Sequence, residues 1–160
     1  MDPIIAPSAQ LLHISDQLFH KGLTDLDRES LLKRCGSESN PIIWIAGHLT
    51  LSRCGLARLI GLEVDHPWAD LFARSAKVTD DLAYPEIGEI ISVWDDVSPQ
   101  LISRLENMTG EQLSSRAGRD FPIADKSLRG AIAFMAWHES YHLGQIAFIR
   151  KWLGLGSFVG

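Results

Sequence analysis

The segment NPIIWIAGHLTLSRCGLARLIG, residues 40–61, has the clearest helix pattern in the chain. Asn40 is a favourable N-cap, Pro41 suits the first position of a helix, and Gly61 is a typical stop after the last turn. The apolar face at helical spacing comprises Trp44, Ile45, Leu51, Leu56 and Leu59. Arg53 falls outside this stripe, so we expect it behind the apolar face. The segment predicts one long amphipathic helix.

Three further segments carry the same helical periodicity, with little strand signal between them. They run from about Pro7 to Leu23, from Pro85 to Met108, and from the N-cap Ser127 to Leu153. Residues 62–84 are too long for a tight turn and indicate a crossover between the second and third helices, with one helical turn near WADLFAR. Residues 109–126 are expected to be a loop. Together these segments predict an all-α fold, a four-helix bundle.

Composition narrows the class of protein. A length of 160 residues suits a single domain over residues 1–160, and 46% hydrophobic with 22% charged residues is typical of a globular chain. The net charge of −5 and the lack of a basic run argue against nucleic acid as a partner. Two cysteines make no disulfide framework, and we find no secretory signal and no apolar run long enough for a membrane span. We therefore expect a cytoplasmic protein.

The fourth predicted helix is apolar nearly all round, which is typical of a helix buried on several sides. Either it is central to the bundle, or its outer face meets another subunit. A homodimer is thus one of two interpretations of this helix.

The same helix contains HESYH, residues 138–142, which matches the His-Glu-x-x-His pattern of zinc proteases. In those enzymes two histidines bind zinc, the glutamate is the general base, and a third ligand usually follows downstream. Residues 143–160 contain no His, Asp, Glu or Cys. The protease hypothesis therefore lacks its usual third ligand and ranks last among those considered.

An upstream histidine could complete a metal site. His48 lies within the apolar stripe of the helix that begins near Asn40, so it should face the core, as His138 and His142 do. Burying three unpaired imidazoles would cost several kcal/mol, whereas a shared metal ion satisfies all of them. The alternative is a set of hydrogen-bonded core histidines without metal.

The segments NPIIWIAGHL (40–49), YPEI (84–87) and WHESYHLGQIAFIRKWLG (137–154) together resemble the DinB/YfiT-like superfamily along essentially the whole chain. The resemblance implies a four-helix bundle with a divalent metal ion, zinc or nickel, on His48, His138 and His142. It implies no role for Glu139. Glu139 and Gln145 are weak catalytic candidates. For Glu139 we favour a carboxylate that is exposed or ion-paired and has no catalytic function. The cofactor-binding residues are unknown.

Three neutral imidazoles leave an ion with an open position, and such an ion acidifies water or a thiol that binds to it. The resemblance implies thiol-dependent S-transferases or isomerases for some members and metal-dependent hydrolases for others. The leading hypothesis is therefore a metal-dependent enzyme acting on a small molecule, with a low-molecular-weight thiol as one cofactor option. The alternative is a non-catalytic, metal-stabilised bundle acting as an interaction or stress-associated protein.

Overall fold

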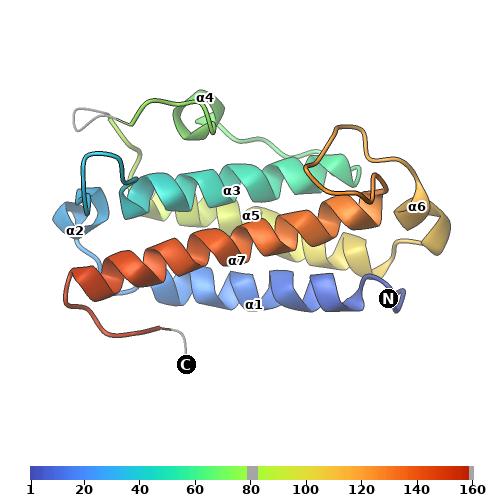
Figure 1. Cartoon of the computed structure of the whole chain (residues 1–160), viewed down its shortest axis with the longest axis horizontal. Helices are drawn as coiled ribbons and strands as arrows, with labels where there is room; N and C mark the ends of the chain where they lie inside the picture. Colours follow the sequence, from blue (N-terminus) through green and yellow to red (C-terminus); the bar gives the residue numbers. More distant parts are fainter. Residues whose placement is uncertain (79–82, 159–160) are drawn as a thin grey trace.

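Four long helices form a bundle in the computed structural model of the chain, which describes residues 1–78 and 83–158 (Figure 1). They are α1 (Ala6–Leu23), α3 (Ile42–Leu59), α5 (Ile87–Glu106) and α7 (Leu128–Trp152). Three short helices lie between them: α2 (Arg28–Leu32), α4 (Ala69–Phe72) and α6 (Gly110–Ser114). Outside these helices, an isolated β-bridge is the only β pairing among the described residues. The predicted all-α four-helix bundle is confirmed.

The helices do not alternate in direction along the bundle. Figure 1 shows α1 and α7 running one way, and α3 and α5 running the other way. Because α3 and α5 point in the same direction, the chain must return along the bundle between them. The predicted crossover makes this return, and its expected helical turn is α4, which packs against α3. Residues 79–82 of the crossover lie outside the described part of the chain.

The helix ends agree with the sequence patterns to within two residues. Ser127 caps α7 as predicted, its side chain accepting a hydrogen bond from the Gly130 amide. Pro41 is itself the N-cap of α3, because its backbone is extended, so that helix begins one residue later than predicted. Helix α5 begins two residues later than predicted, after a capping box formed by Glu86 and Glu89.

The prediction of a loop over residues 109–126 is wrong at its start. Helix α6 forms there because Thr109 and Gln112 make a capping box, each side chain accepting a hydrogen bond from the other residue's backbone amide. The signal was present in the sequence, but a single turn leaves no periodicity to detect.

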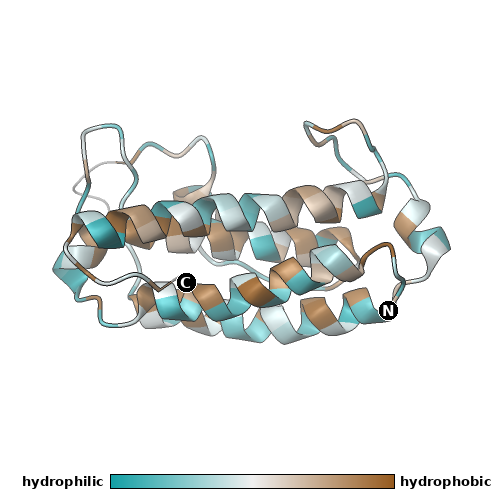
Figure 2. Ribbon diagram, turned by 60° about the horizontal axis from the view of Figure 1, so that its bottom comes forward, coloured by the Kyte–Doolittle hydropathy of each residue, from teal (hydrophilic) through white to brown (hydrophobic). Residues whose placement is uncertain are grey.

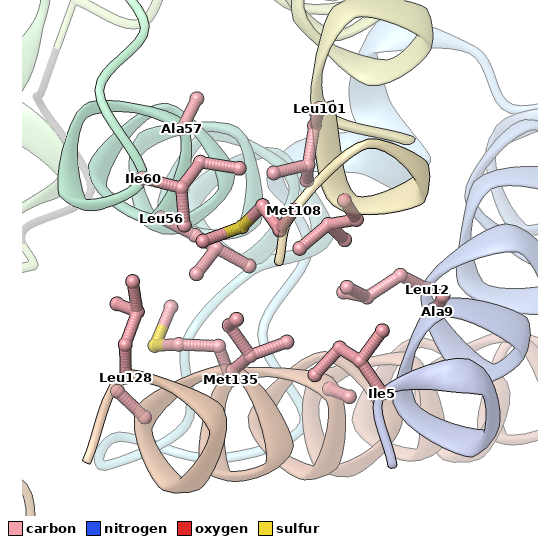
Figure 3. Packing of buried hydrophobic residues seen from close by; sticks show 14 of the residues in the cluster. Ile5, Ala9, Leu12, Leu56, Ala57, Ile60, Leu101, Met108, Leu128 and Met135 are labelled. Atoms are coloured by element: carbon pink, nitrogen blue, oxygen red, sulfur yellow. The ribbon is translucent and has the colours of Figure 1, made fainter. Parts of the chain in front are cut away.

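The interior contains two apolar clusters, one in each half of the bundle. Figure 2 shows apolar and polar residues alternating around the long helices, and Figure 3 shows the cluster nearer the N-terminus of α7. Between the clusters, each long helix contributes polar side chains at about the same level of the bundle. The residues of this polar layer are Asp16, Arg53, Ser98, Glu139 and His142. His142 of this layer also belongs to a group of three histidines that includes His48 and His138.

One expectation about exposure is corrected, and the structure bears on the two interpretations of the last helix. Arg53 has no exposed surface, although the sequence pattern predicts it behind the apolar face. The reason is that α3 packs against α5, α7 and the crossover, so little of it is left to solvent. The outer face of α7 is not covered by the subunit, and it exposes Trp137, Tyr141, Phe148 and Trp152. None of the described helices combines the length and apolar character needed to cross a bilayer.

Candidate metal centre

Three histidine side chains from two helices converge beside the polar layer. His48 projects from the middle of α3, and His138 and His142 project from adjacent turns of α7. The Nε2 atom of His138 lies 3.3 Å from Nε2 of His48 and 3.1 Å from Nε2 of His142. One nitrogen from each ring lies within 4.8 Å of the other two. The structure thus brings together the three residues that the sequence analysis selected.

Two of the rings are oriented by fixed acceptors. His48 Nδ1 lies 2.8 Å from the Phe72 carbonyl oxygen, and His142 Nδ1 lies 2.7 Å from Oε1 of Gln145. An oxygen of this kind can only accept, so Nδ1 carries the proton in both neutral rings and Nε2 presents its lone pair. Metal-ligating histidines are held in this way in most proteins. The third ring, His138, has no hydrogen-bond partner at Nδ1 among the described residues.

The donor set fits a divalent metal ion. Metal–nitrogen bonds of about 2.0–2.1 Å in a tetrahedral site place two ligand nitrogens about 3.3 Å apart. The two Nε2 separations measured from His138, 3.1 and 3.3 Å, match this spacing. Lone pairs that face one another repel unless a cation or a proton lies between them. A metal ion at the centre of the three rings would accept all three nitrogens as ligands.

The surroundings keep all three imidazoles neutral. Burial lowers the pKa of His48. Burial, followed by the neighbouring His142 and His48, lowers the pKa of His138 to about 3. Burial and the neighbouring His48 lower the pKa of His142 to about 4. The positive charges of Arg119 and Arg74 lower the pKa of His138 further. At neutral pH each imidazole is therefore in the neutral form, with one ring nitrogen free of a proton, that a metal requires.

Aromatic rings pack around the three imidazoles. Trp44 stacks on His48 with ring centroids 4.9 Å apart, and Tyr141 meets His142 edge-on at 5.1 Å. Gln145 is half-buried and donates from Nε2 to the Tyr141 hydroxyl at 3.3 Å. Its two hydrogen bonds both stay within α7, so Gln145 orients His142 rather than joining two helices.

A model of the DinB superfamily matches residues 11–146 of the chain. The chain belongs to the DinB superfamily. Among solved structures, it is similar to YfiT from Bacillus subtilis, described as a probable metal-dependent hydrolase with an unusual four-helix bundle topology. The TM-score is 0.68 at 15% identity, over 95% of this chain and 89% of that one. This likeness concerns the fold. No curated protein sequence matches the chain.

Glu139, which the protease pattern would make a base, has a different environment in this DinB-superfamily chain. It has no exposed surface and forms a salt bridge with Arg53 at 2.6 Å. The sequence analysis favours an exposed or ion-paired carboxylate; Glu139 is ion-paired but not exposed. Because its oxygens are engaged there, Glu139 is not placed to remove a proton from a molecule at the three histidines.

A groove beside the metal centre offers room for a small molecule. Its volume is about 400 Å³, and its lining includes Tyr141 and Gln145 of α7 together with Cys35 and Asn40 from the segment before α3. Neither this groove nor a larger one of about 730 Å³ has any of the three histidines in its lining. We associate the smaller groove with the site, because Gln145 is in direct contact with His142.

Sequence patterns missed two features near this DinB-type site. The Phe72 carbonyl, which orients His48, comes from the crossover, and a backbone acceptor carries no sequence signal. Cys54 lies off the apolar stripe of its helix but is fully buried, and burial raises the pKa of its thiol to about 11. Cys54 is therefore not a nucleophile, which agrees with a structural role.

Proposed function

We propose that this DinB-superfamily chain is a metal-dependent enzyme. A divalent cation, zinc or nickel, would be held by His48, His138 and His142, and a small-molecule substrate would bind beside it. The observation that carries the proposal is the convergence of three imidazole Nε2 atoms, two of them in rings whose Nδ1 lies against an acceptor. The reaction would be either a thiol-dependent S-transfer or isomerisation, or a hydrolysis.

The number of ligands favours catalysis over a purely structural site. Structural zinc sites are closed by four protein ligands, whereas catalytic sites use three and leave one position free. Among the described residues, the only group of His, Cys, Asp and Glu placed to hold a metal contains three members. A bound ion would supply Lewis-acid activation of a substrate or thiol. A small molecule in the groove would lie next to Gln145, the hydrogen-bond partner of His142.

The chain's own residues would keep the site rigid and partly dry. Phe72 and Gln145 hold two of the imidazoles in their ligand tautomers, and Trp44 covers one face of His48. Neither cysteine is an activated nucleophile, because burial raises the pKa of both the Cys35 and Cys54 thiols. In the thiol-dependent version of the proposal, the reacting thiol would therefore come from a separate low-molecular-weight cofactor.

Metal content is the first test. Purified wild-type chain is expected to retain about one divalent ion per chain after dialysis, a stoichiometry that follows from a single three-histidine site. The variants His48→Ala, His138→Ala and His142→Ala should each lose it. His13→Ala is the matched control, since His13 is an exposed histidine on α1. A wild-type chain that binds no zinc, nickel or cobalt would refute the metal centre.

A second experiment separates catalysis from metal-based stabilisation. Thermal-shift screening of the metal-loaded chain with several low-molecular-weight thiols would identify a cofactor, and turnover would then be measured before and after chelation. An enzyme loses turnover on chelation and regains it with metal. If the ion only raises the melting temperature, with no thiol bound and no turnover, the chain is a metal-stabilised bundle.

A further inference from the structure

Glu139 and Arg53 form a bidentate ion pair in the middle of the bundle. Arg53 Nε donates to Glu139 Oε1 at 2.9 Å, and Arg53 Nη2 donates to Oε2 at 2.6 Å. Neither side chain has exposed surface. The two residues come from α3 and α7, the same two helices that carry the histidines. The pair therefore joins the two ligand-bearing helices at a second point.

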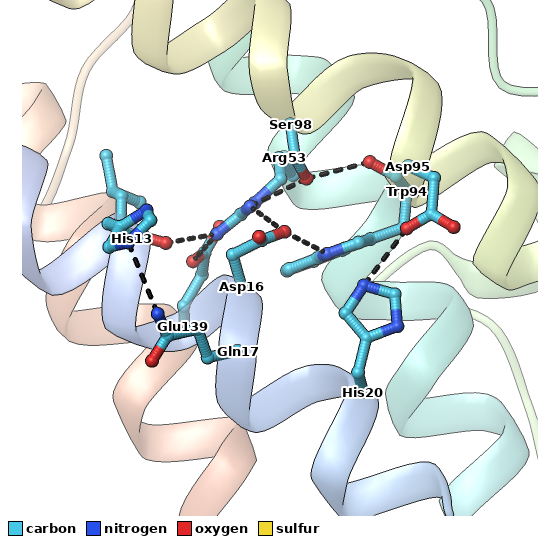
Figure 4. Close-up of polar contacts among 10 residues, drawn as sticks. His13, Asp16, Gln17, His20, Arg53, Trp94, Asp95, Ser98 and Glu139 are labelled. Carbon is cyan, nitrogen blue, oxygen red and sulfur yellow. Dashed lines mark hydrogen bonds and ion pairs between the residues drawn. The ribbon is translucent and has the colours of Figure 1, made fainter.

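The remaining donors of Arg53 reach the other two long helices (Figure 4). Nη1 donates to Ser98 Oγ of α5 at 2.8 Å and approaches Asp16 Oδ1 of α1 at 3.4 Å, while Nη2 also donates to the Leu12 carbonyl of α1 at 2.9 Å. The guanidinium carbon lies 3.7 Å from the centre of the Trp94 ring, and the Trp94 indole donates to Asp16 at 2.8 Å. One arginine of α3 thus contacts the other three long helices of the bundle.

The pair fixes both the height and the rotation of α7 relative to α3. Arg53 follows His48 by five residues on α3, and Glu139 directly follows His138 on α7. Each residue of helical slip moves a side chain by about 1.5 Å along the axis, which is enough to break a bidentate contact. Adjacent helix residues point about 100° apart, so holding Glu139 toward Arg53 also sets the direction of His138.

Stability alone does not account for such a pair. Two fully buried charges lose their hydration, and replacing such a pair with apolar residues of similar size is often neutral or stabilising. We propose that Arg53 and Glu139 are positioning residues, which hold α3 and α7 in the register that brings His48 onto His138 and His142. The positioning role itself does not depend on the metal centre proposed above. Its expected consequence, tight metal binding, does rest on that proposed function.

The test uses a double variant, Arg53→Met with Glu139→Leu, in which the apolar pair keeps the volume but not the directional contact. Without metal, ring-proton Overhauser contacts between His48 and His142, whose centroids lie 4.8 Å apart, should weaken or vanish. Contacts between His138 and His142, 4.4 Å apart within α7, serve as the internal control and should persist. With Co²⁺ as the probe, the dissociation constant should rise about 10- to 100-fold and the visible absorption should change.

Leu105→Ala is the matched control for loss of stability. Leu105 is fully buried on α5, in the apolar cluster that does not contain Trp44 and Phe72, the two residues in contact with His48. It should lower the melting temperature and leave both the Overhauser contacts and the Co²⁺ affinity as in the wild type. Glu139→Gln, which keeps the shape of the side chain and removes its charge, should give a smaller effect of the same kind as the double variant.

The outcomes distinguish this inference from the proposed function. If the double variant keeps the contacts between His48 and His142 and binds Co²⁺ as the wild type does, the positioning role is wrong. It is equally wrong if the double variant fails to fold while Glu139→Gln keeps those contacts, because the pair is then only stabilising. If the wild type binds no Co²⁺ but the double variant loses the contacts, the metal centre fails and the positioning role stands.

Discussion

Gly47→Ala would test how the crossover is docked beside the metal centre. A methyl group at this position of α3 would lie 2.3–2.4 Å from three atoms of the Phe72 ring. Carbon atoms in favourable contact are about 3.5–4.0 Å apart, so the ring would have to retreat by more than about 1 Å. Phe72 is fully buried, and its carbonyl accepts the hydrogen bond from His48. The substitution should therefore disturb both packing and the histidine.

The size of the effect follows from two opposing contributions. Overpacking of a buried site destabilises by about 1–3 kcal/mol, whereas alanine in place of glycine inside a helix stabilises by about 1 kcal/mol. Gly55→Ala on the same helix isolates the second contribution, because its new methyl group would meet only the end of Arg119, at 4.0 Å. The free energy of unfolding of Gly47→Ala should then be lower than that of Gly55→Ala by about 1–3 kcal/mol.

Urea unfolding of the two metal-free variants measures this difference, and Co²⁺ titration supplies a second comparison. Gly47→Ala should bind Co²⁺ more weakly than the wild type, because moving Phe72 removes the hydrogen bond that keeps the proton of His48 on Nδ1. Gly55→Ala should bind Co²⁺ as tightly as the wild type. Equal unfolding free energies and equal Co²⁺ affinities for the two variants would refute the close packing of the crossover against α3.

Three further predictions concern titration, reactivity and assembly. The pKa values of His138 and His142, about 3 and 4 in the folded chain, lie below the value of about 6.5 for an unfolded histidine. The unfolded state therefore binds more protons between these limits, and urea midpoints of the metal-free chain should fall as the pH drops from about 6.5 towards 4; constant midpoints would contradict this. A thiol reagent at pH 8 should label half-buried Cys35 in the folded chain but buried Cys54 only after unfolding, and equal labelling of both would argue against it. We also predict that the exposed aromatic face of α7 pairs with a second copy, so that Trp137→Glu shifts sedimentation from dimer to monomer; a monomeric wild type would exclude this.

Helical periodicity predicted much of this fold because each long helix has an apolar stripe. The same stripe placed His48 among inward residues, and the spacing of His138 and His142 put them on one face of α7. Capping residues predicted the helix ends to within two residues. A residue such as Ser127 accepts a hydrogen bond from one of the backbone amides that have no partner in the first turn of its helix. These features depend on near neighbours in the sequence, which a single chain reveals.

The polar layer could not be predicted in the same way. From the sequence, Arg53 is predicted to be solvated, because a single basic residue outside the apolar stripe of a helix is usually exposed. What allows its burial is Glu139, 86 residues further along the chain, together with acceptors on α1 and α5. The Phe72 carbonyl beside His48 comes from the crossover, and its position depends on the close approach that Gly47 permits. Long-range partners of this kind leave no local pattern.

The unusual direction of the helices has a consequence for the order of folding. In the bundle, α7 lies beside α1 from the start of the chain, and Arg150 donates to the Gly22 carbonyl across 128 residues of sequence. The contact between His48 and His138 spans 90 residues. Contacts between distant segments form slowly, because long loops must close first. The proposed metal centre is thus assembled when α7 docks, and capture of Co²⁺ during refolding would time the docking of that helix.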